Sequence, residues 1–187
     1  MGRRAVAGLV GVVVTLAVAV LVFQSGLWVD VVGVGEYDRG TVTVTDSGQA
    51  TPCTAPPERT AVAACDESRT LATVDVRIAD TQAQRYTGLS DTESLAPNEG
   101  MLFVHDREDE YAYVMRNMSF PIDIIFISTN GTITTIHHAP TPPEGTGDVD
   151  LTRYEGRGKY VLEVNRGWVN QTGVGVGDRV ELPDSVA

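Results

Sequence analysis

Two carboxylates inside apolar segments are the side chains best placed to do chemistry. Asp123 lies in the run IDIIFI at residues 122–127, and Glu163 lies in YVLEV at residues 160–164. A carboxylate on such a strand needs a partner if it turns inward, because burying an unpaired charge is costly. The functional interpretation is a polar cluster at a pocket, where both act as acid and base or bind a ligand.

Arg85 and Asn117 complete the candidate ligand-binding set with Asp123 and Glu163, and Arg85 or Arg116 would neutralise the carboxylates. The structural alternative is that Asp123 accepts backbone N–H bonds and that Arg85 ties a helix to a sheet. Both interpretations stay open. No nucleophile with an obvious base is present, so no catalytic residue is assigned and an enzymatic activity is neither predicted nor excluded.

Met101, Met115 and His137 are the candidate soft-metal ligands, since methionine with imidazole suits copper. The methionines lie in apolar segments, where methionine usually fills gaps in a core. His137 and His138 are adjacent in an extended segment and point to opposite faces. The sequence therefore predicts no metal site and no cofactor.

Cys53 and Cys65 lie in a proline-containing stretch without CxxC spacing, so a disulfide is favoured over free thiols or half of a metal site. Asn130 opens the triplet Asn-Gly-Thr at a predicted hairpin tip and is the candidate glycosylation site.

Most of the chain between residues 71 and 182 reads as short strands. Residues 71–79 alternate polar and apolar positions, and Asp80-Thr81 supplies N-cap chemistry for a short helix within residues 80–91. Asn130-Gly131 predicts a hairpin. Further strands are expected at residues 100–105, 111–115, 122–128, 132–138, 159–164 and 179–182. The pattern favours a mainly β, antiparallel sandwich or barrel with one or two short helices.

An uncharged stretch, residues 5–29, precedes this domain. As a helix it would reach about 37 Å, more than the roughly 30 Å hydrocarbon layer. Arg3 and Arg4 precede it and acidic residues follow it, which places the N-terminus in the cytoplasm and the domain outside. We expect a transmembrane anchor at 1–32 (or a cleaved signal), an extracellular linker at 33–70, which contributes one strand at most, and the domain at 71–184.

The chain is acidic, with 14 Lys+Arg against 25 Asp+Glu and a net charge of −11. Nucleic acid and anionic lipid are disfavoured as partners of such a surface. Lys159 is the single lysine. Acidic excess with almost no lysine is similar to proteins of extreme halophiles.

Several segments in order, ADTQAQRYTGLSD, GMLFV, MRNMSFPIDIIFI, YVLEVNRG and VGVGD, resemble the family named domain of unknown function 192. The resemblance runs from about residue 71 to 182. It implies a compact, mainly β fold in proteins that are often exported or membrane-anchored, and it implies no established activity.

We therefore expect a single-pass, membrane-anchored domain outside the cell that binds a small ligand or a protein partner. One alternative is a hydrolase-like enzyme that uses Asp123 and Glu163. The other is a copper-handling domain that uses methionine and histidine.

Removing salt is expected to destabilise the domain, because repulsion among its acidic side chains is screened at molar salt, where the Debye length falls to about 3 Å. The measurement is thermal unfolding of the full chain in dilute buffer and in molar KCl. A melting temperature independent of salt would contradict the halophilic interpretation.

Overall fold

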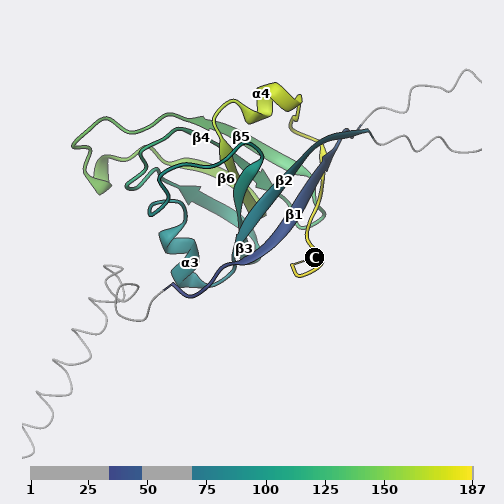
Figure 1. Cartoon of the computed structure of the whole chain (residues 1–187), viewed down its shortest axis with the longest axis horizontal. Coiled ribbons are helices and arrows are strands. Elements are labelled where there is room, and N and C mark those ends of the chain that lie inside the picture. The colour runs from purple at the N-terminus through teal and green to yellow at the C-terminus, as the bar shows by residue number, and fades with distance from the viewer. Residues whose placement is uncertain (1–33, 48–68, 187) are drawn as a thin grey trace, which may run out of the picture.

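The computed structural model describes residues 34–47 and 69–186. These residues form one seven-stranded sheet in the order β5-β4-β6-β3-β2-β1-β7 (Figure 1). Neighbouring strands are antiparallel except β2 and β3, which pair in parallel. The elements are β1 (Asp38–Thr45), β2 (Thr70–Ala79), α3 (Gln82–Thr87), β3 (Glu99–Tyr113), β4 (Ile122–Ile127), β5 (Ile133–Ala139), the 3₁₀ helix η1 (Asp148–Asp150), β6 (Tyr154–Asn165), α4 (Trp168–Thr172) and β7 (Arg179–Glu181).

The sheet curls into a half-barrel whose two edges meet. Thr132, just before β5, forms an isolated bridge with Arg179 of β7. The Val180 N–H donates to the Gly131 carbonyl (2.7 Å), and the Ile133 N–H donates to the Asp178 carbonyl (3.0 Å). The predicted mainly β fold with one or two short helices is confirmed. The strands form one curled sheet instead of two stacked sheets, and the sheet is not wholly antiparallel, because β2 and β3 pair in parallel.

Two hydrophobic cores lie on opposite faces of this sheet. All seven strands contribute to the first core, which therefore fills the inside of the curl. Its members include Val42, Val74, Leu102, Ile125, Ile133, Leu162, Val180 and, from α4, Trp168 and Val169. The second core consists of Ala79, Leu89, Met101, Phe103, Met115, Ile122, Ile124, Phe126, Ala139 and Val161. The cores are separate because successive side chains of a strand point to opposite faces.

Local signals predicted two elements well. Helix α3 begins at the N-cap Thr81, whose hydroxyl accepts from the Gln84 N–H while the Gln84 side chain accepts from the Thr81 N–H, a capping box. The Asn130-Gly131 hairpin joins β4 to β5. Gly131 has φ +82°, a conformation that favours glycine.

The prediction of separate strands at residues 100–105 and 111–115 is wrong. β3 runs without a turn through residues 106–110 and pairs with β6 on both sides of a register shift between Val104 and Asp109. The charged residues are accommodated because the irregularity leaves Asp106, Arg107 and Glu110 exposed. A β-bulge bends a strand without ending it.

Part of the segment expected to be linker belongs to the sheet. β1 pairs with β2 and β7, and its Val42 and Val44 are buried in the first core. The expected membrane span, Cys53 and Cys65 lie outside the described residues. Within residues 34–47 and 69–186, no helix is long and apolar enough to cross a membrane.

Asp123 joins the β4 strand to α4. Its side chain is 0% exposed. Oδ2 accepts from the backbone N–H groups of Gly167 (2.9 Å) and Val169 (3.1 Å). Oδ1 accepts from Arg166 Nη1 (3.2 Å) and lies 2.7 Å from Nδ1 of His138. The carboxylate therefore satisfies orphan N–H groups at the start of the helix, which is the structural role that the sequence left open.

Replacing Asp123 with alanine is expected to destabilise the domain by roughly 3–5 kcal/mol, because it leaves two backbone donors and a guanidinium without their acceptor. The measurement is urea unfolding. Asp75→Ala is the matched control, since Asp75 is exposed and accepts only from the Thr41 hydroxyl among the hydrogen bonds described for it. A similar loss in both variants would contradict a central role for Asp123.

Candidate functional site

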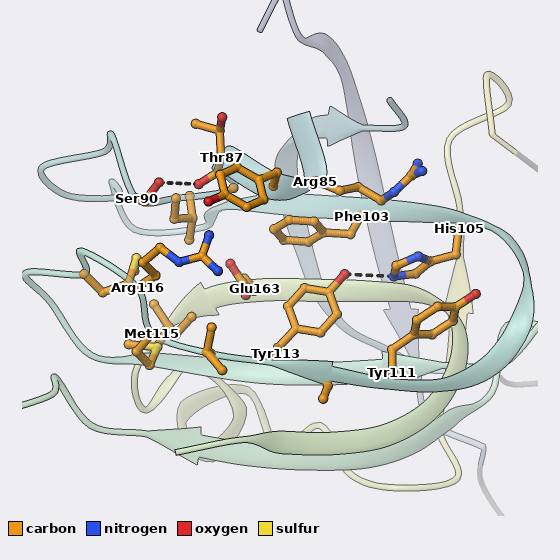
Figure 2. Close-up of a pocket in the computed structure, with 17 residues that line it drawn as sticks. Arg85, Thr87, Ser90, Phe103, His105, Tyr111, Tyr113, Met115, Arg116 and Glu163 are labelled. Carbon is orange, nitrogen blue, oxygen red and sulfur yellow. Dashed lines mark hydrogen bonds between the residues drawn. The ribbon is translucent and has the colours of Figure 1, made fainter. Parts of the chain in front are cut away.

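A cavity of about 230 Å³ lies between α3 and the second-core face of the sheet (Figure 2). α3 and the residues after it form one wall, and β3 with the turn that follows it forms the opposite wall. β6 supplies a single side chain, that of Glu163. The lining residues are 85–90, 103, 105, 111–116, 118, 122 and 163.

Glu163 is the buried polar group of this cavity. Its residue is only 5% exposed, and its carboxyl makes no hydrogen bond within the described part of the chain. Burial away from water raises its pKa from 4.5 to about 8. Figure 2 shows the carboxyl pointing into the space between Arg116 and Tyr113. At pH 7 Glu163 is therefore mostly a neutral carboxylic acid that can donate one hydrogen bond.

The register of β6 places Glu163 on this face. Glu163 lies opposite Met101 of β3 and Ile124 of β4, and both belong to the second core. The neighbouring Gly100 allows the strands to approach, since a Cβ there would lie 2.6 Å from the Glu163 carbonyl oxygen. Glu163 thus lies at a core position, where packing alone would favour an apolar side chain.

Aromatic rings from β3 form one side of the cavity. Phe103 packs edge-to-face with Tyr113 (centroids 5.0 Å apart), and His105 stacks on Tyr111 (3.6 Å). Nε2 of His105 lies 3.0 Å from the Tyr113 hydroxyl. Burial, followed by the charge of Arg85, lowers the pKa of His105 to about 4, so the imidazole is neutral at pH 7. Burial, followed by the charge of Glu163, raises the pKa of Tyr113 well above its usual value.

Two arginines line the cavity, and they differ in the contacts that hold their guanidinium groups. Nη1 of Arg85 donates to the carbonyls of Asp80 and, at 2.8 Å, of Val104, so this side chain ties α3 to β3. Arg116 stacks over the Tyr86 ring, with Cζ 4.5 Å from the centroid. Its Nε is buried without a hydrogen bond and forms an ion pair at 3.5 Å with Asp148 of η1.

The structure does not bring all four predicted residues together. Asp123 lies opposite Val164 on the neighbouring strand, whereas Ile124 lies opposite Glu163. Asp123 and Glu163 therefore point to opposite faces of the sheet. Asn117 is exposed in a turn with φ +53° and does not line the cavity. Of the predicted set, Glu163 and Arg85 meet at the cavity.

The candidate metal ligands are also dispersed. Met101 is 0% exposed in the second core, and Met115 is buried at the cavity wall. Nε2 of His137 lies 2.8 Å from the Glu155 carbonyl, and its ring packs against Phe126. Among the described residues, no group of three or more His, Cys, Asp or Glu side chains is arranged to hold a metal ion.

Asn130, the candidate glycosylation site, lies in the exposed hairpin turn. Its side-chain carbonyl accepts from the Ser128 hydroxyl (2.6 Å) and from the Thr132 N–H (3.1 Å). The amide is thus positioned by the turn itself.

Sequence reasoning missed the aromatic wall and gave Arg116 only a secondary role. The signal was present in the alternation of β3, where Phe103, His105, Tyr111 and Tyr113 all occupy odd positions. The acidic stretch between them concealed that they belong to one strand. Cavities that combine aromatic walls with a few polar groups and a residue of perturbed pKa are the usual form of ligand sites.

Two solved structures are similar to the chain. One is described as a "putative transcription regulator" from Sinorhizobium meliloti 1021, with 29% identity and a TM-score of 0.61 over 80% of this chain and 97% of that chain. The other is a protein of unknown function from Novosphingobium aromaticivorans DSM 12444, with 27% identity and a TM-score of 0.56 over 77% of this chain and 85% of that chain.

No curated protein matches the chain. The family described as DUF192, an uncharacterized ACR, matches residues 63–182, which include β2 to β7 and every residue that lines the cavity. The chain therefore belongs to the DUF192 family.

Proposed function

We propose that this domain is a small-ligand-binding module and that the ligand occupies the cavity at Glu163. The observation that carries the proposal is a carboxyl buried at the base of the cavity without a hydrogen-bond partner among the described residues. The Glu163 oxygens are not among the fully enclosed polar atoms that lack a partner, so they face the cavity, where a ligand can satisfy them.

The surroundings of Glu163 support a binding role. Phe103 and Tyr113 offer apolar surface for a ligand body, while Arg116 and Glu163 offer hydrogen bonds in different directions. The aromatic rings are held by contacts with one another, so the site is largely formed without a ligand. Preorganisation of this kind lowers the entropic cost of binding.

The two alternatives have less support. An enzyme that uses Asp123 and Glu163 on one substrate needs both carboxylates in one site, and the β4–β6 register separates them. Asp123 is also occupied by His138 of β5 and by three donors at the start of α4. Copper handling needs Met101, Met115 and His137 together, and Met101 and His137 do not line the cavity that Met115 reaches.

We further propose that the protein is a halophile's single-pass membrane protein with this domain outside the cell. The charge-free stretch at residues 5–29, the arginines before it and the acidic composition support this placement. The net charge of −11 also supports a small ligand or a protein partner over nucleic acid.

A fragment library of neutral, anionic and cationic compounds is expected to yield ligands that shift the NMR amide signals of Gly88, Ser90, Ala112 and Met115 in the full chain in detergent. Ala112→Trp should abolish these shifts, because Ala112 is an exposed residue at the cavity wall. Thr73→Trp, an exposed change on β2, is the matched control. Ligands that bind only elsewhere, or none, would overturn the proposal.

Glu163→Gln is expected to be more stable than the wild type above pH 8, by a few kcal/mol. The folded pKa of about 8 exceeds the ordinary value of 4.5, so the folded state holds a proton that the unfolded state has released between these values. Wild-type stability therefore falls as pH rises through this window. Urea unfolding from pH 5 to 9 measures the difference.

The matched control for this pH series is Glu155→Gln, an exposed change on the same strand. Its stability curve should run parallel to that of the wild type. If Glu163→Gln also runs parallel, Glu163 is not a buried neutral acid in the unliganded protein.

A further inference from the structure

The cavity differs in charge from the rest of the molecule. The chain as a whole is strongly acidic, with 25 Asp+Glu against 14 Lys+Arg. Of the described residues that line the cavity, however, Arg85 and Arg116 are basic and Glu163 alone is acidic. The Arg85 guanidinium points away from Glu163, toward the Asp80 and Val104 carbonyls, whereas Arg116 lies beside Glu163 (Figure 2). With Glu163 mostly protonated at pH 7, no acidic residue of the lining offsets the positive charge of Arg116. A negatively charged ligand is therefore favoured there.

Arg116 is held ready for such a ligand. Stacking on Tyr86 fixes the plane of the guanidinium, whose Cζ lies 4.5 Å from the ring centroid. Its side chain is 31% exposed and points toward Glu163 (Figure 2). A guanidinium in a fixed plane can bind a carboxylate through two parallel hydrogen bonds.

The ion pair between Asp148 and Arg116 is weak. The Oδ2 to Nε distance is 3.5 Å, which is an ion pair without a hydrogen bond, and the Asp148 side chain is 70% exposed. Exposed ion pairs of this kind contribute about 0–1 kcal/mol. η1, which carries Asp148, belongs to the connection between β5 and β6 and not to the sheet. Asp148 does not line the cavity, so an anion in the cavity competes with it for the charge of Arg116 without having to take its place.

We propose that the ligand is a small organic carboxylate on an apolar or aromatic body, with its carboxylate between Arg116 and the carboxyl of Glu163 and its body against Phe103 and Tyr113. This inference rests on the proposed ligand-binding function of the cavity. Asp148 then competes with the ligand for the charge of Arg116.

Proton linkage follows from this arrangement. The free Glu163 has a pKa of about 8, and an anion bound beside it favours the protonated form still more. Binding therefore takes up protons, and affinity falls as pH rises through 8 and above. A cationic ligand would behave in the opposite way. The other charged or titratable groups that face the cavity are Arg85, Tyr86, His105, Tyr111, Tyr113 and Arg116.

The test uses three probes of matched shape, benzoate, benzyl alcohol and benzylammonium, titrated into the full chain in detergent by calorimetry from pH 6 to 9. Benzoate is expected to bind about tenfold tighter than the alcohol, as one charge-assisted pair allows, with benzylammonium weakest. Benzoate affinity should fall above pH 8, with proton uptake measured by repeating the titration in buffers of different ionisation enthalpy.

Three variants locate the effect. Arg116→Gln should weaken benzoate about tenfold or more while leaving benzyl alcohol unchanged. Asp148→Ala should strengthen benzoate by up to about fivefold, because the competing carboxylate is gone. Asp150→Ala is the matched control on η1, since no ion pair of Asp150 is described, and should leave the affinity unchanged.

Two results would overturn the inference. In the first, benzylammonium binds more tightly than benzoate, its affinity rises with pH, and Glu163→Gln abolishes its binding. The cavity would then still be a ligand site, but its ligand would be a cation. Equal or absent binding of all three probes would reject a carboxylate ligand. The fragment library tests separately whether any small ligand binds in the cavity. Failure of the carboxylate inference can therefore be distinguished from failure of the proposed binding function.

Discussion

The pairing of β6 on both sides is the constraint on which the rest of the structure depends. β6 bonds to β3 along one edge and to β4 along the other, and its residues 160–164 are buried on both faces. Leu162 and Val164 enter the core inside the curl, while Val161 and Glu163 enter the core on the other face. A slip of one residue would exchange these sets and remove the carboxyl from the cavity.

The same alternation explains why Glu163 carries a cost in stability that its neighbour on the same face does not. Val161 at the equivalent face contributes to packing at no electrostatic cost, whereas Glu163 must be neutralised by a proton to stay buried. Asp123 shows the opposite solution on the other face, where four donors surround the carboxylate and bind α4 to the sheet. Of the two buried acids in adjacent strands, Glu163 thus shapes the cavity, whereas Asp123 stabilises the fold.

Sequence reasoning succeeded where the signal is local. The Asn130-Gly131 hairpin and the Thr81 cap depend on a few adjacent residues, and both elements form where expected. It failed where the structure depends on pairing between strands that are far apart in the sequence. The continuity of β3 through residues 106–110 is decided by its partner β6, some 50 residues later. The opposed directions of Asp123 and Glu163 likewise depend on register, which residue types do not specify. The cavity followed from residue chemistry only in part, through Glu163 and Arg85.

The parallel pairing of β2 with β3 determines which segment of the chain lines the cavity. Two parallel neighbours cannot be joined by a tight hairpin, so the chain must cross over between them, and here the crossover comprises α3 and residues 88–98. That crossover supplies Tyr86, the stacking partner of Arg116, and one whole wall of the cavity. Substitutions or insertions there can change the shape and the lining of the cavity while the hydrogen-bonded ladder stays intact. The crossover is therefore the segment where the lining of the cavity can change without altering the pairing of the strands.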